Sequence, residues 1–270
     1  IGLVLFGCGT ALLSWLLEIF GEHRLDPTST GVLFVLSLAL LAAYGWHARR
    51  TRDPLLRLSL FHMRTFRVSV LGGFITRLGI GGLPFLLPLL YQIGMGRPAW
   101  QSGLLMMPAT VAAMGMKLCT APILKRFGYK RVLTVNTLMI GVTIGLFSLL
   151  TTETPVAFII MLGLAQGFFN SLQFSSMNTM AYADIRTEDS SMASSIASSF
   201  QQLSMSFGLA VGSLVTAWYL GDLPQSDRIA VMNALHHAFL TLGAVTLVSS
   251  LAFWTLRKND GESVSQGRAA

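Results

Sequence analysis

The chain has 270 residues, of which 53% are hydrophobic and only 11% are charged, and its mean hydropathy is +0.62. Ordinary soluble domains carry about a quarter charged residues, so this composition argues against a water-soluble enzyme fold. A net charge of +7 also occurs in nucleic-acid-binding proteins, but here the basic residues form short clusters between apolar runs. We therefore expect the lipid bilayer, and no nucleic acid, as a partner.

Eight apolar segments, each about long enough to cross a hydrocarbon core of ~30 Å, follow one another along the chain. They cover residues 1–20, 29–48, 66–94, 101–124, 131–151, 155–181, 191–219 and 230–256. The ten-residue alternation of polar and apolar positions that is typical of membrane β-barrels is absent from the sequence. The sequence therefore predicts an all-α polytopic membrane protein with eight transmembrane helices.

Lysines and arginines indicate how these spans are oriented, because short cytoplasmic loops hold an excess of both. The basic clusters at residues 49–67, 125–131, 186 and 257–268 fall on one side of the predicted topology, and only Arg24, Arg97 and Arg228 fall on the other. The first residue and the C-terminal tail are then both predicted to be cytoplasmic.

The longest predicted cytoplasmic loop is basic and separates the first two spans from the next six, which indicates a domain boundary. The predicted units are a helix pair at 1–48, the basic loop at 49–65, a six-helix unit of two triplets at 66–256, and a cytoplasmic tail at 257–270. A six-helix unit built from two triplets is typical of half a secondary transporter. Because the chain begins with Ile1 inside an apolar run, we interpret it as a fragment.

The third span is dense in residues that bend helices, among them Gly81, Gly82, Pro84 and Pro88. Proline removes a backbone donor, and such a run bends or loosens a membrane helix. Two interpretations stay open: a bent helix that moves during gating, or an inert kink.

Small residues recur at every fourth position in three later spans. The series are Gly141 and Gly145; Gly163 and Gly167; and Ser204, Gly208, Gly212 and Thr216. Such stripes let two helix backbones approach closely. They indicate either ordinary helix packing or a surface that slides during alternating access.

Two cations lie within predicted spans. Arg77 is ten residues beyond Arg67, about 15 Å along a helix, and Lys117 is eight residues before Lys125, about 12 Å. A cation at such depth costs about 2.5–3.5 kcal/mol on insertion scales, so it normally faces a cavity or a partner. For Arg77 the alternatives are an anionic substrate or a proton-carrying carboxylate, or a structural pair with another helix. For Lys117 they are lining a cavity or snorkelling to the interface.

The sixth span places amides at helical spacing on one face, namely Gln166, Asn170 and Gln173, with Asn178 nearby. Gln201 is a further amide within the seventh span. Amides in lipid must form hydrogen bonds, so these side chains either join neighbouring helices or line a polar translocation path.

Catalytic and cofactor-binding patterns are absent from the sequence. The histidines are scattered, the adjacent His236 and His237 point to different helix faces, and no Walker-type glycine loop occurs. We therefore expect no enzyme activity, metal or cofactor. No Asp or Glu lies deep in the last six spans, so a proton-carrying carboxylate would be Glu18 or would lie upstream.

Several stretches together resemble a known family of transporters. They are RLGIGGLPFLLPLLYQIGMG (77–96), SGLLMMPA (102–109), MGMK (114–117), RFGYKRVL (126–133), QGFFNSLQFSSMNTM (166–180) and QLSMSFG (202–208). They look like the C-terminal part of the major facilitator superfamily. More narrowly, they resemble its fourteen-span drug/proton antiporters of the EmrB/QacA type, especially the MdtD-like bacterial members.

This resemblance implies that the first two spans are an extra pair inserted between two six-helix halves. The last six spans would form the C-terminal half, and the N-terminal half would be missing from this chain. The implied function is efflux of small amphipathic compounds across the bacterial cytoplasmic (inner) membrane, with the proton gradient as energy source. The alternative is uptake or facilitated transport of a small organic anion or metabolite without drug export.

Members of the superfamily that this chain resembles carry a loop motif of the form G-x-x-x-D-R-x-G-R-R/K. In its place stand Lys125, Arg126, Gly128 and Lys130. Ala121 replaces the first glycine of the motif and Lys125 replaces its acid. We therefore expect these basic residues to set topology rather than to relay charge.

Overall fold

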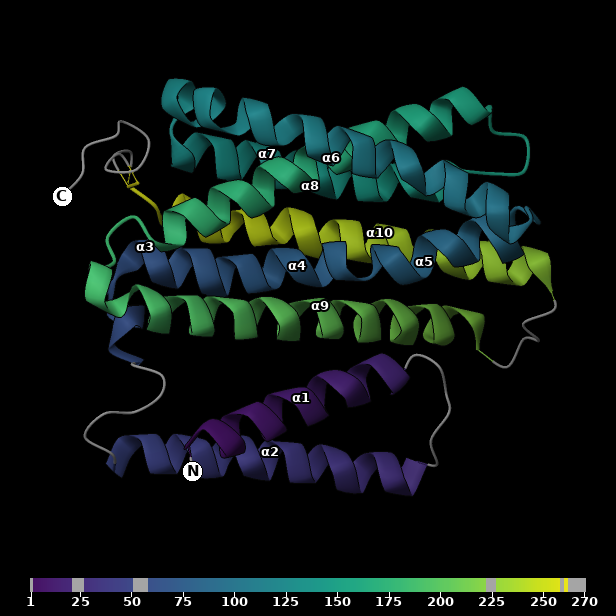
Figure 1. Ribbon diagram of the computed structural model, residues 1–270. Helices are drawn as coiled ribbons and strands as arrows, with labels where there is room; N and C mark the ends of the chain where they lie inside the picture. Colours follow the sequence, from purple (N-terminus) through teal and green to yellow (C-terminus); the bar gives the residue numbers. More distant parts are fainter. Residues whose placement is uncertain (1, 21–26, 51–57, 222–226, 258–259, 262–270) are drawn as a thin grey trace.

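The computed structural model describes residues 2–20, 27–50, 58–221, 227–257 and 260–261, and these residues form a helical bundle without strands (Figure 1). Its α-helices are α1 (Gly2–Phe20), α2 (Pro27–Arg50), α3 (Arg64–Arg67), α4 (Gly73–Gly81), α5 (Leu83–Leu89), α6 (Ala99–Phe127), α7 (Tyr129–Leu146), α8 (Val156–Ala181), α9 (Ser190–Leu220) and α10 (Arg228–Trp254). Every predicted span is helical, so the all-α prediction is confirmed.

Within the described residues, seven helical segments are long and apolar enough to cross a membrane. They correspond to the predicted spans from the second to the eighth. The first predicted span is α1, whose apolar stretch Val4–Leu17 is shorter. Parts of two predicted units, the loop at 49–65 and the tail at 257–270, lie outside the described residues, as does the side chain of Glu18.

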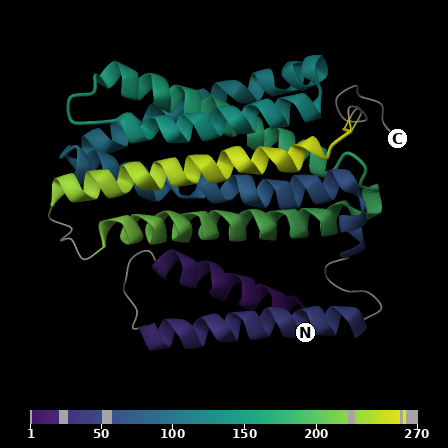
Figure 2. The same cartoon turned by 180° about the vertical axis from the view of Figure 1, so that it is seen from behind.

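Successive spans run in alternating directions, so the start of α1 and the end of α10 lie at the same end of the bundle (Figures 1 and 2). The turn between α6 and α7 and the turn between α8 and α9 lie at this end as well. We refer to it as the basic end, because Lys125, Arg126 and Arg131 are placed there by the α6–α7 turn. This alternation is what the distribution of lysine and arginine predicts.

The helices pack as neighbouring pairs. The most extensive contacts join α6 to α8 and α7 to α10, α9 packs against α4, and α1 packs against both α2 and α9 (Figure 1). The largest apolar core includes Leu86 of α5, Phe239 and Leu242 of α10, and Phe147 at the end of α7, all almost fully buried. The α1–α2 pair therefore lies at one edge of the bundle, and α6 and α7 lie at the opposite edge.

The third span is interrupted, as its glycines and prolines predict. It consists of α3, a π-helical turn Val68–Gly72, α4, a break at Gly82, α5 and a second π-helical turn Leu90–Gly94. Pro84 lies in the first turn of α5 and Pro88 lies inside it, where neither can donate a backbone hydrogen bond. At the break, a Cβ added to Gly81 would lie 2.8 Å from the carbonyl oxygen of Met205 in α9.

Close backbone packing is also what the small-residue series predict. A Cβ on Gly208 of α9 would lie 2.8 Å from the Cα of Gly81, and one on Gly243 of α10 would lie 2.9 Å from the carbonyl oxygen of Gly141. Gly145, which belongs to the same series as Gly141, has open space at its own Cβ position. The packing interpretation of these stripes is therefore observed, and sliding along them stays a hypothesis.

Candidate functional site

Arg77 is a buried cation in the middle of the third span. It lies in α4 with 4% of its surface exposed, and its guanidinium carbon is 5.1 Å from the centre of the Phe174 ring of α8. Among the described residues, its Nε has no hydrogen-bond partner, and no Asp or Glu forms an ion pair with it. A Cβ on Gly73 would lie 2.8 Å from Nη1, so this glycine makes room for the guanidinium one turn away.

The aromatic contact compensates only part of the cost of burying this charge. A cation over a ring face gains about 2 kcal/mol or more when desolvated, whereas an uncompensated ion in low dielectric costs several kcal/mol. Within the part of the chain that the structure describes, Arg77 therefore has an unmet requirement for an anion or for polar acceptors. Both alternatives for Arg77, an anionic group of a substrate or carboxylate and a structural pair with another helix, are compatible with this environment.

Lys117, the second cation predicted within a span, has a different environment. It lies on α6 and its side chain is exposed, next to Leu118 and close to Met114, which are 85% and 68% exposed. Arg77 is thus enclosed between helices, whereas Lys117 lies on an exposed apolar face of the described part. Both alternatives for Lys117, cavity lining and snorkelling, are compatible with this position.

The amides of α8 divide into two groups. Gln166 donates through Nε2 to Oδ1 of Asn170 at 3.1 Å, and Gln166 is only 3% exposed. The Oε1 of Gln166 is buried without a partner among the described residues. This pair therefore combines a half-buried amide with an unsatisfied buried acceptor, so it can bind a donor from a ligand or from water.

Gln173 belongs to the second group and joins α8 to α7. Its Nε2 donates to Oγ1 of Thr137 at 2.7 Å, and its Oε1 accepts from Nδ2 of Asn136 at 2.8 Å. Asn136 also donates to the backbone oxygen of Phe169 at 2.8 Å. For Gln173, the interhelical hydrogen bonding that was one of two alternatives is thus observed. Asn136 and Thr137 were not predicted from the sequence, although two adjacent polar residues inside an apolar span are a recognisable signal.

The other predicted path residues are less enclosed. Asn178 is exposed near the end of α8, and Gln201 is half-buried on α9. The hydroxyl of Ser69 donates to the backbone oxygen of Met177, which ties the third span to α8. The structure thus brings Arg77 close to α8 through Phe174, whereas Asn178 and Gln201 lie at more exposed positions.

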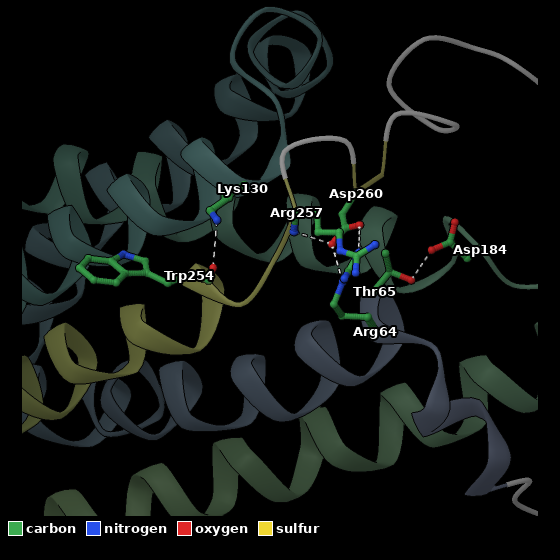
Figure 3. Close-up of polar contacts among 7 residues, drawn as sticks. All are labelled: Arg64, Thr65, Lys130, Asp184, Trp254, Arg257 and Asp260. Carbon is green, nitrogen blue, oxygen red and sulfur yellow. Dashed lines mark hydrogen bonds and ion pairs between the residues drawn. The ribbon is translucent and has the colours of Figure 1, made fainter.

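The predicted loop motif forms a turn of one residue between α6 and α7. Gly128 has φ 74° and ψ 157°, a backbone region that is essentially restricted to glycine. Lys125 and Arg126 are exposed in the last turn of α6. Lys130 donates through Nζ to the backbone oxygen of Trp254 at 2.9 Å, so it links the start of α7 to the end of α10 (Figure 3).

Acidic residues at the basic end form contacts that were not predicted from the sequence (Figure 3). Arg64 donates to both carboxylate oxygens of Asp260, at 2.9 Å from Nε and 2.6 Å from Nη2. The backbone N–H of Arg257 donates to the same carboxylate at 2.8 Å. Thr65 donates to Asp184 at 2.7 Å, so the start of the third span is tied both to the segment after α10 and to the α8–α9 turn.

The chain is similar to known transport proteins along its length. The family model of the Major Facilitator Superfamily matches residues 1–208 and 71–270. "Putative multidrug resistance protein MdtD" of Serratia proteamaculans is 32% identical over 252 residues, which are 93% of this chain and 53% of the relative. Its counterpart in Enterobacter sp. is 31% identical over 267 residues, 99% of this chain and 57% of the relative. "Probable transport protein HsrA" of Haemophilus influenzae is 30% identical over 261 residues, which are 97% of this chain and 56% of the relative.

The chain spans about half the length of the curated relatives it matches.

Proposed function

The chain belongs to the major facilitator superfamily, and on this premise we propose that it is the C-terminal part of a secondary transporter that exports small amphipathic compounds in exchange for protons. The helical bundle and the relatives named as multidrug resistance proteins support this function. The observation that carries the proposal is the buried guanidinium of Arg77, which has no acidic partner in the described part of the chain.

In this proposal, α1 and α2 are the extra helix pair (residues 1–48) and residues 66–256 are the C-terminal six-helix half. A further six-helix half upstream completes the transporter, and the two halves rock about a central path in the bacterial cytoplasmic membrane. The basic end faces the cytoplasm, because its loops hold most of the lysines and arginines.

Arg77 has a defined electrostatic task in this mechanism. Its guanidinium attracts an anionic or strongly polar group of the substrate, or a carboxylate of the other half, into the path. When a proton neutralises that carboxylate, its attraction to Arg77 ends. The substrate, or the other half of the transporter, then separates from Arg77. The break at Gly82 is about 7.5 Å farther along the span, close enough to Arg77 for a movement of α5 to change the surroundings of the guanidinium.

The polar pair Gln166 and Asn170 contributes a second contact, since Gln166 retains an unsatisfied acceptor among the described residues. Lys117, Asn178 and Gln201 are assigned to the wall of the path, where their exposed or half-buried side chains can meet the substrate or the other half. Gln173 is assigned a positioning role, because its amide is occupied by α7.

The test uses everted membrane vesicles that contain the complete transporter, energised so that their interior is acidic. A panel of amphipathic compounds, including ethidium as a lipophilic cation and norfloxacin as a carboxylate-bearing zwitterion, is added while the pH gradient is followed with a fluorescent amine. An antiporter dissipates the gradient when a substrate enters. The substitution R77Q should lower this response by at least about tenfold, because a hydrogen bond to a charged group contributes roughly 1.5–3 kcal/mol.

The matched control is R67Q, which removes one exposed positive charge from the basic end of the same span. It should leave the response unchanged at equal abundance in the membrane. Wild-type activity for R77Q, with substrate affinity also unchanged, would contradict the role of Arg77. A complete transporter that never dissipates the gradient with any compound would contradict proton-coupled export.

The second candidate function is uptake or facilitated transport of a small organic anion, for which the buried cation at Arg77 would be the binding group. In right-side-out vesicles without a pH gradient, this transporter would equilibrate a radiolabelled carboxylate such as benzoate. R77Q would abolish that flux, and no compound would dissipate the gradient in everted vesicles.

A further inference from the structure

A cationic depression lies at the basic end of the bundle, on the edge farthest from the α1–α2 pair. It has a volume of about 780 Å³, and its lining includes Arg126, Lys130 and Arg131 together with the ring of Trp254. Among the described residues, no Asp or Glu contributes to this lining. Three cations thus surround one partly open space, and the described lining offers them no neutralising charge.

The donors in this depression are available to a ligand. Lys130 uses one of its three ammonium protons for the backbone oxygen of Trp254, which fixes its position and leaves two protons for other acceptors. Arg131 and Arg126 are exposed. The hydroxyl of Thr134, which also lines the depression, is buried without a hydrogen-bond partner among the described residues. Such a set of donors matches a phosphate group.

An apolar track continues from the depression toward the middle of the span. Its side chains lie on two helices and are each at least 39% exposed: Val135, Met139 and Val142 on α7, and Val248, Leu251 and Trp254 on α10. The two helices are in close contact, since a Cβ on Gly141 would lie 3.0 Å from the carbonyl oxygen of Gly243. The track therefore runs along two adjacent helices.

The length of the track fits an acyl chain. Arg131 and Val142 are eleven residues apart on one helix, which corresponds to about 16 Å or half the thickness of a ~30 Å hydrocarbon core. Trp254 lies where depression and track meet, and tryptophan is enriched at the boundary between headgroups and hydrocarbon. We therefore expect the depression to lie at headgroup level and the apolar track to lie within the hydrocarbon.

We propose that this α7–α10 face binds an anionic phospholipid, with the phosphodiester held by Arg126, Lys130 and Arg131 and an acyl chain lying along the track. The cations of the depression alone would equally accept a free phosphate, but a free phosphate would make no contact with the apolar track. Basic pockets at the cytoplasmic side of membrane helices are suited to such headgroups. Lipid binding at this face does not require transport activity.

The test is native mass spectrometry of the complete transporter in detergent with equal amounts of phosphatidylglycerol and phosphatidylcholine. The protein should retain phosphatidylglycerol about fivefold more for each cation that contributes, because a Lys or Arg near the surface contributes roughly 1 kcal/mol toward anionic lipid. In R126Q/R131Q this preference should fall to about fivefold, the contribution of the remaining Lys130. R186Q removes an exposed arginine that pairs with Glu188 at the same end, and it should keep the preference.

Two further measurements locate the ligand and identify its source. Phosphatidylglycerol with brominated acyl chains should quench the fluorescence component that is lost in W254F, and brominated phosphatidylcholine should quench it less. Millimolar inorganic phosphate or glycerol 3-phosphate should not displace the lipid; displacement would indicate a free-phosphate site instead. If R126Q/R131Q fails to fold, R131Q alone is used. Equal retention of both lipids by the wild type, or loss of preference in R186Q as well, would overturn the proposal.

Discussion

The two faces of α8 are packed by different kinds of contact. On the face toward α6, Gly167 brings the helix so close that a Cβ there would overlap the carbonyl oxygen of Ala109 and lie 2.6 Å from its carbonyl carbon. On the face toward α7, Gln173 forms hydrogen bonds to Asn136 and Thr137. One helix is thus held on one side mainly by close backbone contact at a small residue, with one hydrogen bond from the hydroxyl of Ser171 to the backbone oxygen of Ala113 at 2.8 Å. On the other side it is held by directional bonds between polar side chains.

The two interfaces of α8 therefore depend on different properties of their side chains. Backbone contact at a glycine depends on shape, so it requires a missing side chain at one position and tolerates changes elsewhere. A network of amides depends on direction, so it fixes the register of two helices, and every buried group left without a partner carries a cost. The α6 face of α8 should therefore be sensitive to added volume, and its α7 face should be sensitive to lost polar atoms.

The largest effect is expected for G167A. The new methyl group would meet backbone atoms of Ala109, its carbonyl oxygen, its carbonyl carbon and its Cα, and none of these can move without shifting α6. Overpacking of this kind costs about 1–3 kcal/mol or more in the free energy of unfolding, and we expect the upper end. Denaturant titration in mixed micelles measures it.

The matched control is G115A on α6, where a Cβ would meet nothing within 4 Å. Because the methyl group has room, G115A should not lower the free energy of unfolding and should raise it by about 0.4–1 kcal/mol. If G167A were equally mild, the approach of α6 and α8 would not depend on the missing side chain.

An intermediate effect is expected on the α7 face, where N136A and Q173A should each cost about 1–2 kcal/mol, because each leaves buried donors or acceptors unpaired. A double-mutant cycle isolates their bond. The coupling energy should be about 0.6 kcal/mol and below about 1.7, the range for hydrogen bonds between membrane helices. A coupling near zero would mean that the two amides stabilise α7 and α8 independently, and the directional description of this face would be wrong.

Much of the fold could be predicted from the sequence, and the reason is physical. In lipid, every backbone polar group must be satisfied within its own segment, so apolar length predicts helices almost directly. The stripes Gly163 and Gly167, and Gly208 and Gly212, likewise identify helix contacts, because backbone approach needs only small residues. The interruption near Gly82 follows from proline's missing donor.

The candidate site could be predicted only in part. The sequence identifies Arg77 as a buried cation, because its depth follows from distance along a helix. It does not identify which amides of α8 are occupied, because Gln166 and Gln173 share a helical stripe and differ only in what neighbouring helices offer them. It also misses the ion pair between Arg64 and Asp260, which are 196 positions apart in the chain.

The smallest effect is expected for G163A, which tests how far the close contact on the α6 face of α8 extends. This residue is one turn from Gly167 on the same face of α8, yet a Cβ there would lie 3.7 Å from Pro108 Cβ and 3.8 Å from the carbonyl oxygen of Leu105, which is ordinary van der Waals contact. With room available, replacing glycine by alanine restricts the unfolded chain and should raise the free energy of unfolding by about 0.4–1 kcal/mol.

G163A and G167A would then change stability in opposite directions, although they are the same substitution in one stripe. That result would mean that the backbones of α6 and α8 approach most closely at Gly167, with ordinary contact at Gly163 and the hydrogen bond from Ser171 to Ala113 on either side of it. Destabilisation by both variants would instead mean continuous contact over two turns, and the α6 face of α8 would then fix helix register as firmly as the amides of the α7 face do.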